Sequence, residues 1–334
     1  MARFFRVQEG DRPDLAAIGG ASQADLKGYA FPKLFPLVRV GEKSGKFSVA
    51  PAGLTASKGT KGRANGTALP STDVTPVDVS WSCARYEGRG RIFEDDGAAW
   101  ASPEACDQAG AETAQRLAWN KVEDEAFATL FTAVRKTGAA ELADHAVVKT
   151  LQAKAKGLRA YGRPVLVMTT ATWMSFVEVP EIRHRLERFA GAGNDVGFLA
   201  ADAEKVRAAV STLIGFADIV LFDADLVDAS GAYEGLVAVV GLRDAQGDVL
   251  QAIKTRATYG WATVYLPDAA TGDKPFDMRT WYDNANKANV YDAEAHLGIV
   301  EAFSGAVAMT KLATAYTEYA VPVVNVAAAA DSGS

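Results

Sequence analysis

The chain has 334 residues, of which 49% are hydrophobic and 23% charged, and its formal net charge is −6. This composition is typical of a globular protein that is long enough for one elaborate domain or two simple ones. Tight nucleic-acid binding, which needs a basic surface, is disfavoured, and no stretch reaches the roughly 18 apolar residues of a membrane span, so we expect a soluble, cytosolic protein.

The first 30 residues show no sustained periodicity and are predicted to form an irregular arm. Apolar runs at 34–40 and 46–49 then flank the turn-rich sequence GEKSG, a pattern that predicts a hairpin. At 77–83 the sequence VDVSWSC alternates apolar and polar residues, which predicts a strand buried on one face.

A glycine-rich basic segment lies between these strands. Residues 53–70 contain four glycines and no acidic residue, and their basic residues are Lys58, Lys61 and Arg63. So few apolar side chains cannot offset the entropy of ordering the segment. We predict that it is the tip between two extended arms, and that either something outside the segment orders it or nothing does.

Residues 102–138 carry the signals of one long helix. Ser102 suits the N-cap and Pro103 the first helical position, and Gly138 follows two basic residues. Such a helix would be about 50 Å long. Its second half has an apolar stripe, whereas its first half is rich in alanine and acidic residues. We expect the second half to pack in a core and the first half to face a partner.

Helices and strands alternate after this helix, as in an α/β unit. The pattern predicts helices at 147–158, 170–189 with a break at Pro180, and 202–214, and strands at 165–168 and 218–222. The runs 236–240 and 249–253 predict a hairpin, and the sequence from 258 onwards is β-rich and aromatic.

Charge is unevenly distributed along the chain. Residues 39–91 hold nine basic and four acidic residues, whereas residues 94–125 hold nine acidic and two basic ones. Each stretch can be a solvated face, and the two can also attract each other between molecules.

Patterns typical of enzymes are missing from the sequence. The glycine-rich segment fits no phosphate-binding motif, the turn after the 165–168 strand lacks glycine, and 223–234 matches a calcium loop at too few positions. The three histidines lie in separate segments, and the cysteines Cys83 and Cys106 form no CxxC motif. We therefore predict no catalytic residue, no metal site and no cofactor.

The order of these parts resembles the major capsid proteins of tailed bacteriophages, whose Hong Kong 97-like fold is shared by encapsulin shells. Three stretches carry the resemblance: RYEGRGRIFEDDG (85–97), GRPVLVMTTATWMSF with VPEIRHRLERF (162–189), and FDMRTWYDNANKANVYDAEAHLGIVEAFSGAVAMTKL (276–312). It spans about 30 to 312 and is one of pattern, because no single motif is specific.

The resemblance implies an α+β phage capsid fold with an N-terminal arm, an extended β-hairpin loop, a long spine helix, a peripheral domain and an axial α/β domain. The implied divisions are the N-terminal arm at 1–30, the extended loop and its flanking strands at 31–92, the spine helix of the peripheral domain at 93–139, the axial domain at 140–255, and the closing peripheral strands with the C-terminal tail at 256–334.

The implied function is that of a major capsid protein, which assembles with itself into the hexamers and pentamers of an icosahedral head around double-stranded DNA. The implied location is the virion, assembled in the bacterial host cytoplasm, with scaffold, portal and decoration proteins as further partners and no membrane. We predict that Lys58, Lys61 and Arg63 of one subunit meet an acidic surface of a neighbour, formed by Glu94, Asp95, Asp96, Glu104 and Asp107.

Three alternatives stay open at this stage. An encapsulin-type nanocompartment shell has the same fold, and a soluble α/β enzyme or ligand-binding protein could be built on residues 140–255. Within a shell, Lys58 or Lys61 could be cross-linked to Asn286 or Asn289 of a neighbour, although the sequence holds no signature for this.

Overall fold

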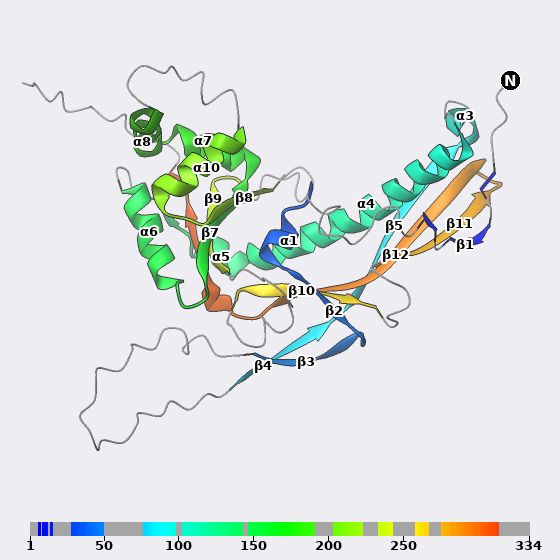
Figure 1. Cartoon of the computed structure of the whole chain (residues 1–334), viewed down its shortest axis with the longest axis horizontal. Helices are drawn as coiled ribbons and strands as arrows, with labels where there is room; N and C mark the ends of the chain where they lie inside the picture. The colour runs from blue at the N-terminus through cyan, green and yellow to red at the C-terminus, as the bar shows by residue number, and fades with distance from the viewer. Residues whose placement is uncertain are drawn as a thin grey trace, which may run out of the picture.

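The computed structural model describes residues 6–7, 9–12, 14–15, 28–49, 76–97, 102–142, 146–190, 203–222, 233–242, 258–266 and 275–313. Its longest helix, α4 (Pro103–Leu130), lies along a six-stranded sheet, and its C-terminal end reaches a five-stranded sheet (Figure 1). Short helical elements are α1 (Phe31–Leu34), α3 (Glu94–Gly97) and the 3-10 turn η4 (Ser304–Ala306).

The six-stranded sheet is built around β12 (Ala288–Glu301). On one side of β12 the strands are β11 (Asp277–Asp283), β1 (Gly10–Asp11), β10 (Gly260–Tyr265) and β2 (Leu37–Val40), and on the other side lies β5 (Ala84–Phe93). All of these pairs are antiparallel except β10 with β2, which is parallel. The sheet therefore joins segments from both ends of the chain.

Small residues bring α4 very close to this sheet. A Cβ atom added at Gly88 of β5 would lie 1.8 Å from the carbonyl oxygen of Ala114, and one added at Gly90 would lie 2.4 Å from that of Gly110. Ala111, Ala114 and Ala118 of α4 are fully buried. The expectation that the alanine-rich first half faces a partner is therefore wrong for these residues. Their lack of bulk lets the helix backbone pack directly against the strands.

The long helix begins where the sequence predicts but ends earlier. Ser102 Oγ accepts a hydrogen bond from the N–H of Ala105 at 3.2 Å, and Pro103 is the first helical residue. Helix α4 stops at Leu130, and α5 (Ala133–Thr137) starts after the N-cap residue Thr132. The prediction of one unbroken helix over 102–138 is therefore wrong at its C-terminal end.

Tertiary contacts explain this break. Phe131 leaves the helical conformation, with φ −98° and ψ 53°, and its ring packs 5.5 Å from Phe222 and 5.3 Å from Tyr233. Arg135 Nη1 turns back to donate to the carbonyl oxygens of Thr129 and Leu130 at 2.9 and 3.0 Å. The carbonyls that the break leaves without helical partners are thus satisfied by a side chain.

The five-stranded sheet has the order β6 (Ala140–Glu141), β13 (Val307–Lys311), β9 (Leu236–Leu242), β7 (Arg163–Thr169) and β8 (Asp218–Phe222). One face packs against the helices α6 (Val147–Gly157), α7 (Thr170–Glu178), α8 (Pro180–Ala190) and α10 (Ala203–Ile214). The other face meets the end of α4, where the Phe127 and Phe222 rings stack with centroids 3.9 Å apart.

Most predictions for this unit are confirmed. The helix breaks at Pro180, and α10 stops before Gly215, whose φ of +78° suits glycine. The segment of β13 was grouped with the peripheral strands in the sequence analysis, but in the structure β13 pairs with β9 of the five-stranded sheet. The second strand of the hairpin predicted after 236–240 and most of the calcium-like loop lie outside the described residues.

A separate two-stranded sheet consists of β3 (Ser44–Val49) and β4 (Val77–Ser82). Strand β4 shows the predicted alternation, with Val79 and Trp81 buried. The hairpin predicted across 34–49 is wrong, because β2 pairs in parallel with β10 and β3 pairs with β4. The glycine-rich tip between β3 and β4, with Lys58, Lys61 and Arg63, lies outside the described residues.

Candidate functional site

The acidic residues singled out in the sequence lie at one end of the molecule (Figure 1). Glu94, Asp95 and Asp96 belong to α3, and Glu104 and Asp107 lie in the first two turns of α4. Their chain order explains this, because α3 and α4 are separated by only five residues. The structure thus gathers these side chains, which we call the acidic end.

Two members of the acidic end are bound by other side chains of the same molecule. Tyr291 donates its hydroxyl to Asp107 Oδ1 at 2.7 Å, and Arg12 Nη1 lies 3.3 Å from Asp107 Oδ2. Tyr282 donates to Glu94 Oε1 at 2.5 Å. Burial raises the pKa of Tyr291, so its hydroxyl stays protonated and continues to donate. These carboxylates fasten α3 and α4 to β11 and β12.

The other three members, Asp95, Asp96 and Glu104, are exposed. The pKa of Glu104 is lowered by hydrogen bonds from its own backbone N–H and from Ser102, as expected for an acid in the first turn of a helix. Its negative charge therefore persists at neutral pH. These three residues are the part of the acidic end that is available to another molecule.

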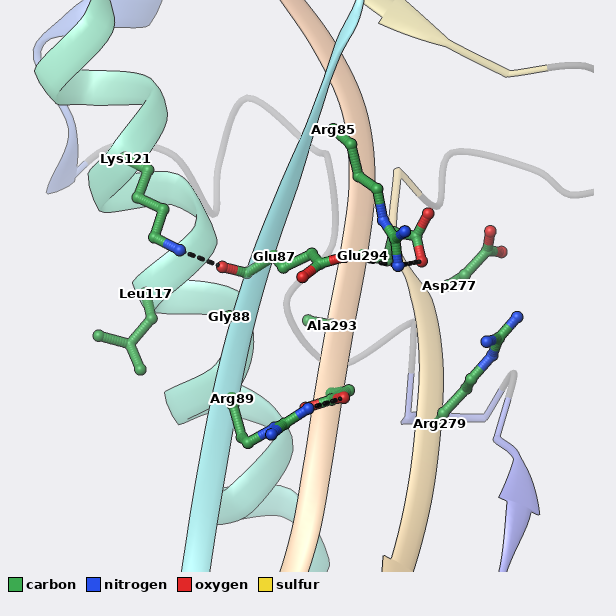
Figure 2. Close-up of a pocket in the computed structure, with 11 residues that line it drawn as sticks. Arg85, Glu87, Gly88, Arg89, Leu117, Lys121, Asp277, Arg279, Ala293 and Glu294 are labelled. Carbon is green, nitrogen blue, oxygen red and sulfur yellow. Dashed lines mark hydrogen bonds and ion pairs between the residues drawn. The ribbon is translucent and has the colours of Figure 1, made fainter.

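A second group of charged residues lies on β5, β12 and β11, on the sheet face opposite α4. It lines a cavity of about 510 Å³, which we call the charged trough and which is bounded on the α4 side by Leu117 and Lys121 (Figure 2). The basic members are Arg85, Arg89, Lys121 and Arg279, and the acidic members are Glu87, Asp277, Asp292 and Glu294.

Cross-strand ion pairs fix the side chains of the trough. Arg89 binds Asp292 through two hydrogen bonds of 2.6 and 2.8 Å, and Arg85 Nη2 lies 2.7 Å from Glu294 Oε2. Lys121 Nζ donates to the carbonyl oxygen of Glu87 at 2.7 Å, as Figure 2 shows. Because the two signs balance, the trough suits a polar protein surface better than a nucleic acid.

The sequence analysis missed this trough. A signal existed, because Arg85, Glu87, Arg89 and Arg91 occupy every second position of β5 and therefore share one face. The acidic partners stand on β12, about two hundred residues later, and the pairing of β5 with β12 is not visible in local patterns.

The predicted basic partner of the acidic end cannot be placed, because it falls outside the described residues. Asn289, one candidate for cross-linking, is buried and accepts a hydrogen bond from the N–H of Val7 at 3.1 Å. Asn286 is exposed and binds Asp283 at 2.7 Å. The cross-linking hypothesis stays a prediction.

The described residues contain no group of three or more histidine, cysteine, aspartate or glutamate side chains that could hold a metal ion. Cys83 is half-buried and Cys106 is buried, and both are free thiols. Within the described ranges, no helix combines the length and the apolarity that crossing a membrane requires.

Comparison with known proteins gives no match to a family model or a curated sequence. Among solved structures, a phage-related protein from Bordetella bronchiseptica RB50 is 12% identical, and the match covers 91% of this chain and 98% of that one with a TM-score of 0.57. A structure from Microbacterium phage Oxtober96 (11% identity, 87% and 99% coverage, TM-score 0.48) and a virus-like particle from Pyrococcus furiosus (11%, 89% and 98%, 0.45) match less well. The predicted α+β phage capsid fold is thus confirmed, because the chain shares the fold of the Bordetella phage-related protein.

Proposed function

We propose that this chain is a major capsid protein, the self-assembling subunit of an icosahedral tailed-phage head that encloses double-stranded DNA. The observation that carries the proposal is the fold shared with a phage-related protein over 91% of the chain. A shell subunit acts by binding copies of itself, which agrees with the charged surface that the described residues form.

The two-stranded sheet β3–β4 supports this proposal. It packs against the six-stranded sheet, because the Phe47 ring of β3 lies 5.7 Å from the ring of Trp81 in β4 and 5.9 Å from the ring of Trp261 in β10. Between Val49, the last residue of β3, and Val77, the first residue of β4, the sequence has 27 residues. Connections of that length between strands are uncommon in compact domains and often serve binding, so we propose that a neighbouring subunit is the partner of this one.

Within the shell, we propose that Lys58, Lys61 and Arg63 approach the acidic end of a neighbour. Asp95, Asp96 and Glu104 supply the contacts, because they are exposed, while Asp107 and Glu94 contribute mainly through their charge. Exposed ion pairs are worth only about 0 to 1 kcal/mol each. Their role is therefore to steer subunits and set their register, with apolar contacts supplying the adhesion.

We also propose a division of the chain into two domains and a location for the assembled protein. The six-stranded sheet with α4 is the peripheral domain, and the five-stranded sheet with its helices is the axial domain, which gathers at the axes of pentamers and hexamers. The assembled chain belongs to the virion, is built in the cytoplasm of a bacterial host, contacts packaged DNA without sequence preference, and meets scaffold, portal and decoration proteins.

Charge reversal tests the interface. We expect the triple variant Lys58→Glu, Lys61→Glu, Arg63→Glu to assemble more slowly in light scattering while its unfolding midpoint stays unchanged. The matched control reverses three exposed charges on and just after α6, Lys149→Glu, Lys156→Glu and Arg159→Glu, for the same change in net charge.

A second set of reversals, Asp95→Lys, Asp96→Lys and Glu104→Lys, should restore assembly. We expect this both when the six substitutions are combined in one chain and when the two triple variants are mixed as separate proteins. Equal assembly of the loop variant, the control and the wild type would remove the proposed contact. A chain that stays monomeric, and whose melting temperature rises with a small ligand, would instead favour the enzyme alternative.

A further inference from the structure

The two-stranded sheet β3–β4 joins the rest of the molecule at one junction. Residues 41–43 connect β2 to β3, and Cys83 connects β4 to β5, so both strands leave the six-stranded sheet at the same place. There the Cys83 N–H donates to the carbonyl oxygen of Lys43 at 2.7 Å, beside the first pair of the β3–β4 ladder, Ser44 with Ser82. Contacts of Lys43 therefore help to hold the two-stranded sheet against the six-stranded sheet.

The side chain of Lys43 contacts His296 of β12. Its Nζ lies 3.1 Å from His296 Nε2 and 5.3 Å from the centroid of the Tyr265 ring of β10. The nearby Cys83 thiol contacts the Thr263 hydroxyl instead, at 3.5 Å, and burial raises its pKa. A lysine ammonium can only donate hydrogen bonds, so Nε2 must be the acceptor and must carry no proton. The contact between Lys43 and His296 therefore requires a neutral imidazole with its proton on Nδ1.

Groups of both charges surround His296, whose side chain is 20% exposed and so within reach of solvent protons. On its own strand, Glu294 Oε1 lies 3.4 Å from Nε2, and on β5 the residue opposite His296 is Arg85. Arg85 Nη2 is bound to Glu294 at 2.7 Å and to Glu87 at 2.5 Å. On β10, the Tyr265 ring meets the imidazole edge-on, with centroids 5.9 Å apart. The imidazole thus lies between a lysine and a carboxylate.

Protonation of His296 exchanges one partner for the other. Histidine side chains gain their proton between about pH 8 and pH 5. In the charged form Nε2 becomes a donor, so it repels the Lys43 ammonium and is attracted to the Glu294 carboxylate. The contact with Lys43 is therefore present at neutral and higher pH and is lost as the pH falls, whereas the contact with Glu294 becomes stronger.

We infer that His296 is a pH-sensitive switch: the neutral side chain holds Lys43 and the two-stranded sheet against the six-stranded sheet, and the protonated side chain releases them. The inference goes beyond the proposed shell function and does not depend on it, because all of these contacts lie within one copy of the chain. The Phe47 ring still packs 5.9 Å from the Trp261 ring after the release. We therefore expect a looser junction at acidic pH and no detachment of the sheet.

Amide hydrogen exchange of the unassembled protein, followed by mass spectrometry, tests the switch. It is measured near the two ends of the histidine range, at about pH 7.5 and about pH 5.5, and corrected for the intrinsic effect of pH on exchange. Protection of β3 and β4 should fall by about two- to fivefold at the lower pH, as expected for a contact between exposed charged groups. Strand β7 of the five-stranded sheet is the internal reference and should keep its protection.

Two substitutions of His296 fix the switch in one state each. His296→Gln offers an amide oxygen to Lys43 at every pH, so β3 and β4 should stay protected at both values. His296→Lys carries a permanent charge, so the strands should already be loose at the higher pH. Lys43→Met removes the cation that is repelled and should also abolish the pH response, which keeps the test decisive if His296→Lys does not fold.

The matched control is the double variant His145→Gln, His184→Gln, which leaves His296 as the only histidine of the chain and should respond to pH as the wild type does. Equal protection of β3 and β4 at both pH values in the wild type would overturn the inference. A pH response that persists in His296→Gln or in Lys43→Met would overturn it as well, because the response would then come from other groups such as Glu294. Neither result bears on the shell function, which particle formation tests separately.

Discussion

The contact between β5 and α4 allows a sharp test of how the fold is held together. Substituting Gly88→Ala adds one methyl group 1.8 Å from the carbonyl oxygen of Ala114 and 2.9 Å from the backbone nitrogen of Ala118. Both atoms belong to the helix backbone, so no side-chain rotation can relieve the clash. The helix must move away from the sheet by more than 1 Å, roughly the difference from an ordinary van der Waals contact.

The expected cost lies at the upper end of the range for overpacked cores, about 3 kcal/mol. A movement of α4 also loosens the buried alanines Ala111, Ala114 and Ala118, which touch the same strands. If the whole chain unfolds as one unit, its unfolding entropy is about 0.7 kcal/mol per kelvin, so this destabilisation lowers the melting temperature by about 4 °C.

Urea and thermal unfolding, followed by circular dichroism on unassembled protein at fixed concentration, measures this effect. The control is Gly41→Ala, where an added Cβ meets no atom within 4 Å. We expect the control to stay within about 0.5 kcal/mol of the wild type. Equal stability of the two variants would refute the idea that this close approach fixes the position of the helix.

Two further substitutions probe other anchors of α4. Burial raises the pKa of Glu123, whose carboxylate accepts the N–H groups of Ala30 and Phe31 at 2.9 and 3.0 Å. A buried acid with a raised pKa is protonated more readily in the folded state than in the unfolded state. At neutral pH, where the carboxylate is ionised, it therefore lowers the free energy of unfolding, and this loss is relieved as the pH falls through the raised pKa towards the ordinary value of 4.5. The urea stability of the wild type relative to Glu123→Gln should therefore improve between pH 7 and pH 5, and a constant difference would contradict this. Arg135→Ala removes both the cap on the α4 carbonyls and the ion pair with Glu301, and should cost about 3 kcal/mol in urea unfolding. Arg279→Ala, which removes only an exposed pair with Asp11, should cost less than about 1 kcal/mol, and similar losses for the two would refute the capping role.

Local signals in the sequence were sufficient where short-range chemistry decides the structure. The start of α4 follows from Ser102 and Pro103, and the burial of Val79 and Trp81 follows from the alternation along β4. The end of α10 follows from Gly215. In each case the residue acts through its own backbone preference or through its spacing.

Local signals failed where distant segments decide. GEKSG looks like a hairpin turn, but β2 instead pairs with β10, whose residues come more than two hundred positions later. Helix α4 ends at Phe131 because Phe222 and Tyr233 receive its ring. From the sequence, the alanine-rich half of α4 has too few large apolar side chains for a core position. It is buried nevertheless, because Gly88 and Gly90 of β5 let the backbone of the helix approach the sheet.

The candidate site was predictable to a similar extent. Clustering of the acidic end could be expected from the nearness of α3 and α4 in the chain, whereas the capture of Asp107 by Tyr291 and Arg12 could not. That capture needs β12 and the N-terminal arm to meet α4, which only the complete fold provides. The charged trough depends in the same way on the register of β5 with β12.

The central claim is that this chain forms a closed shell of many copies. Electron microscopy of the purified chain, across a range of protein and salt concentrations, tests it most directly. We expect closed particles of uniform size. Correctly folded molecules that remain single under all of these conditions would contradict it.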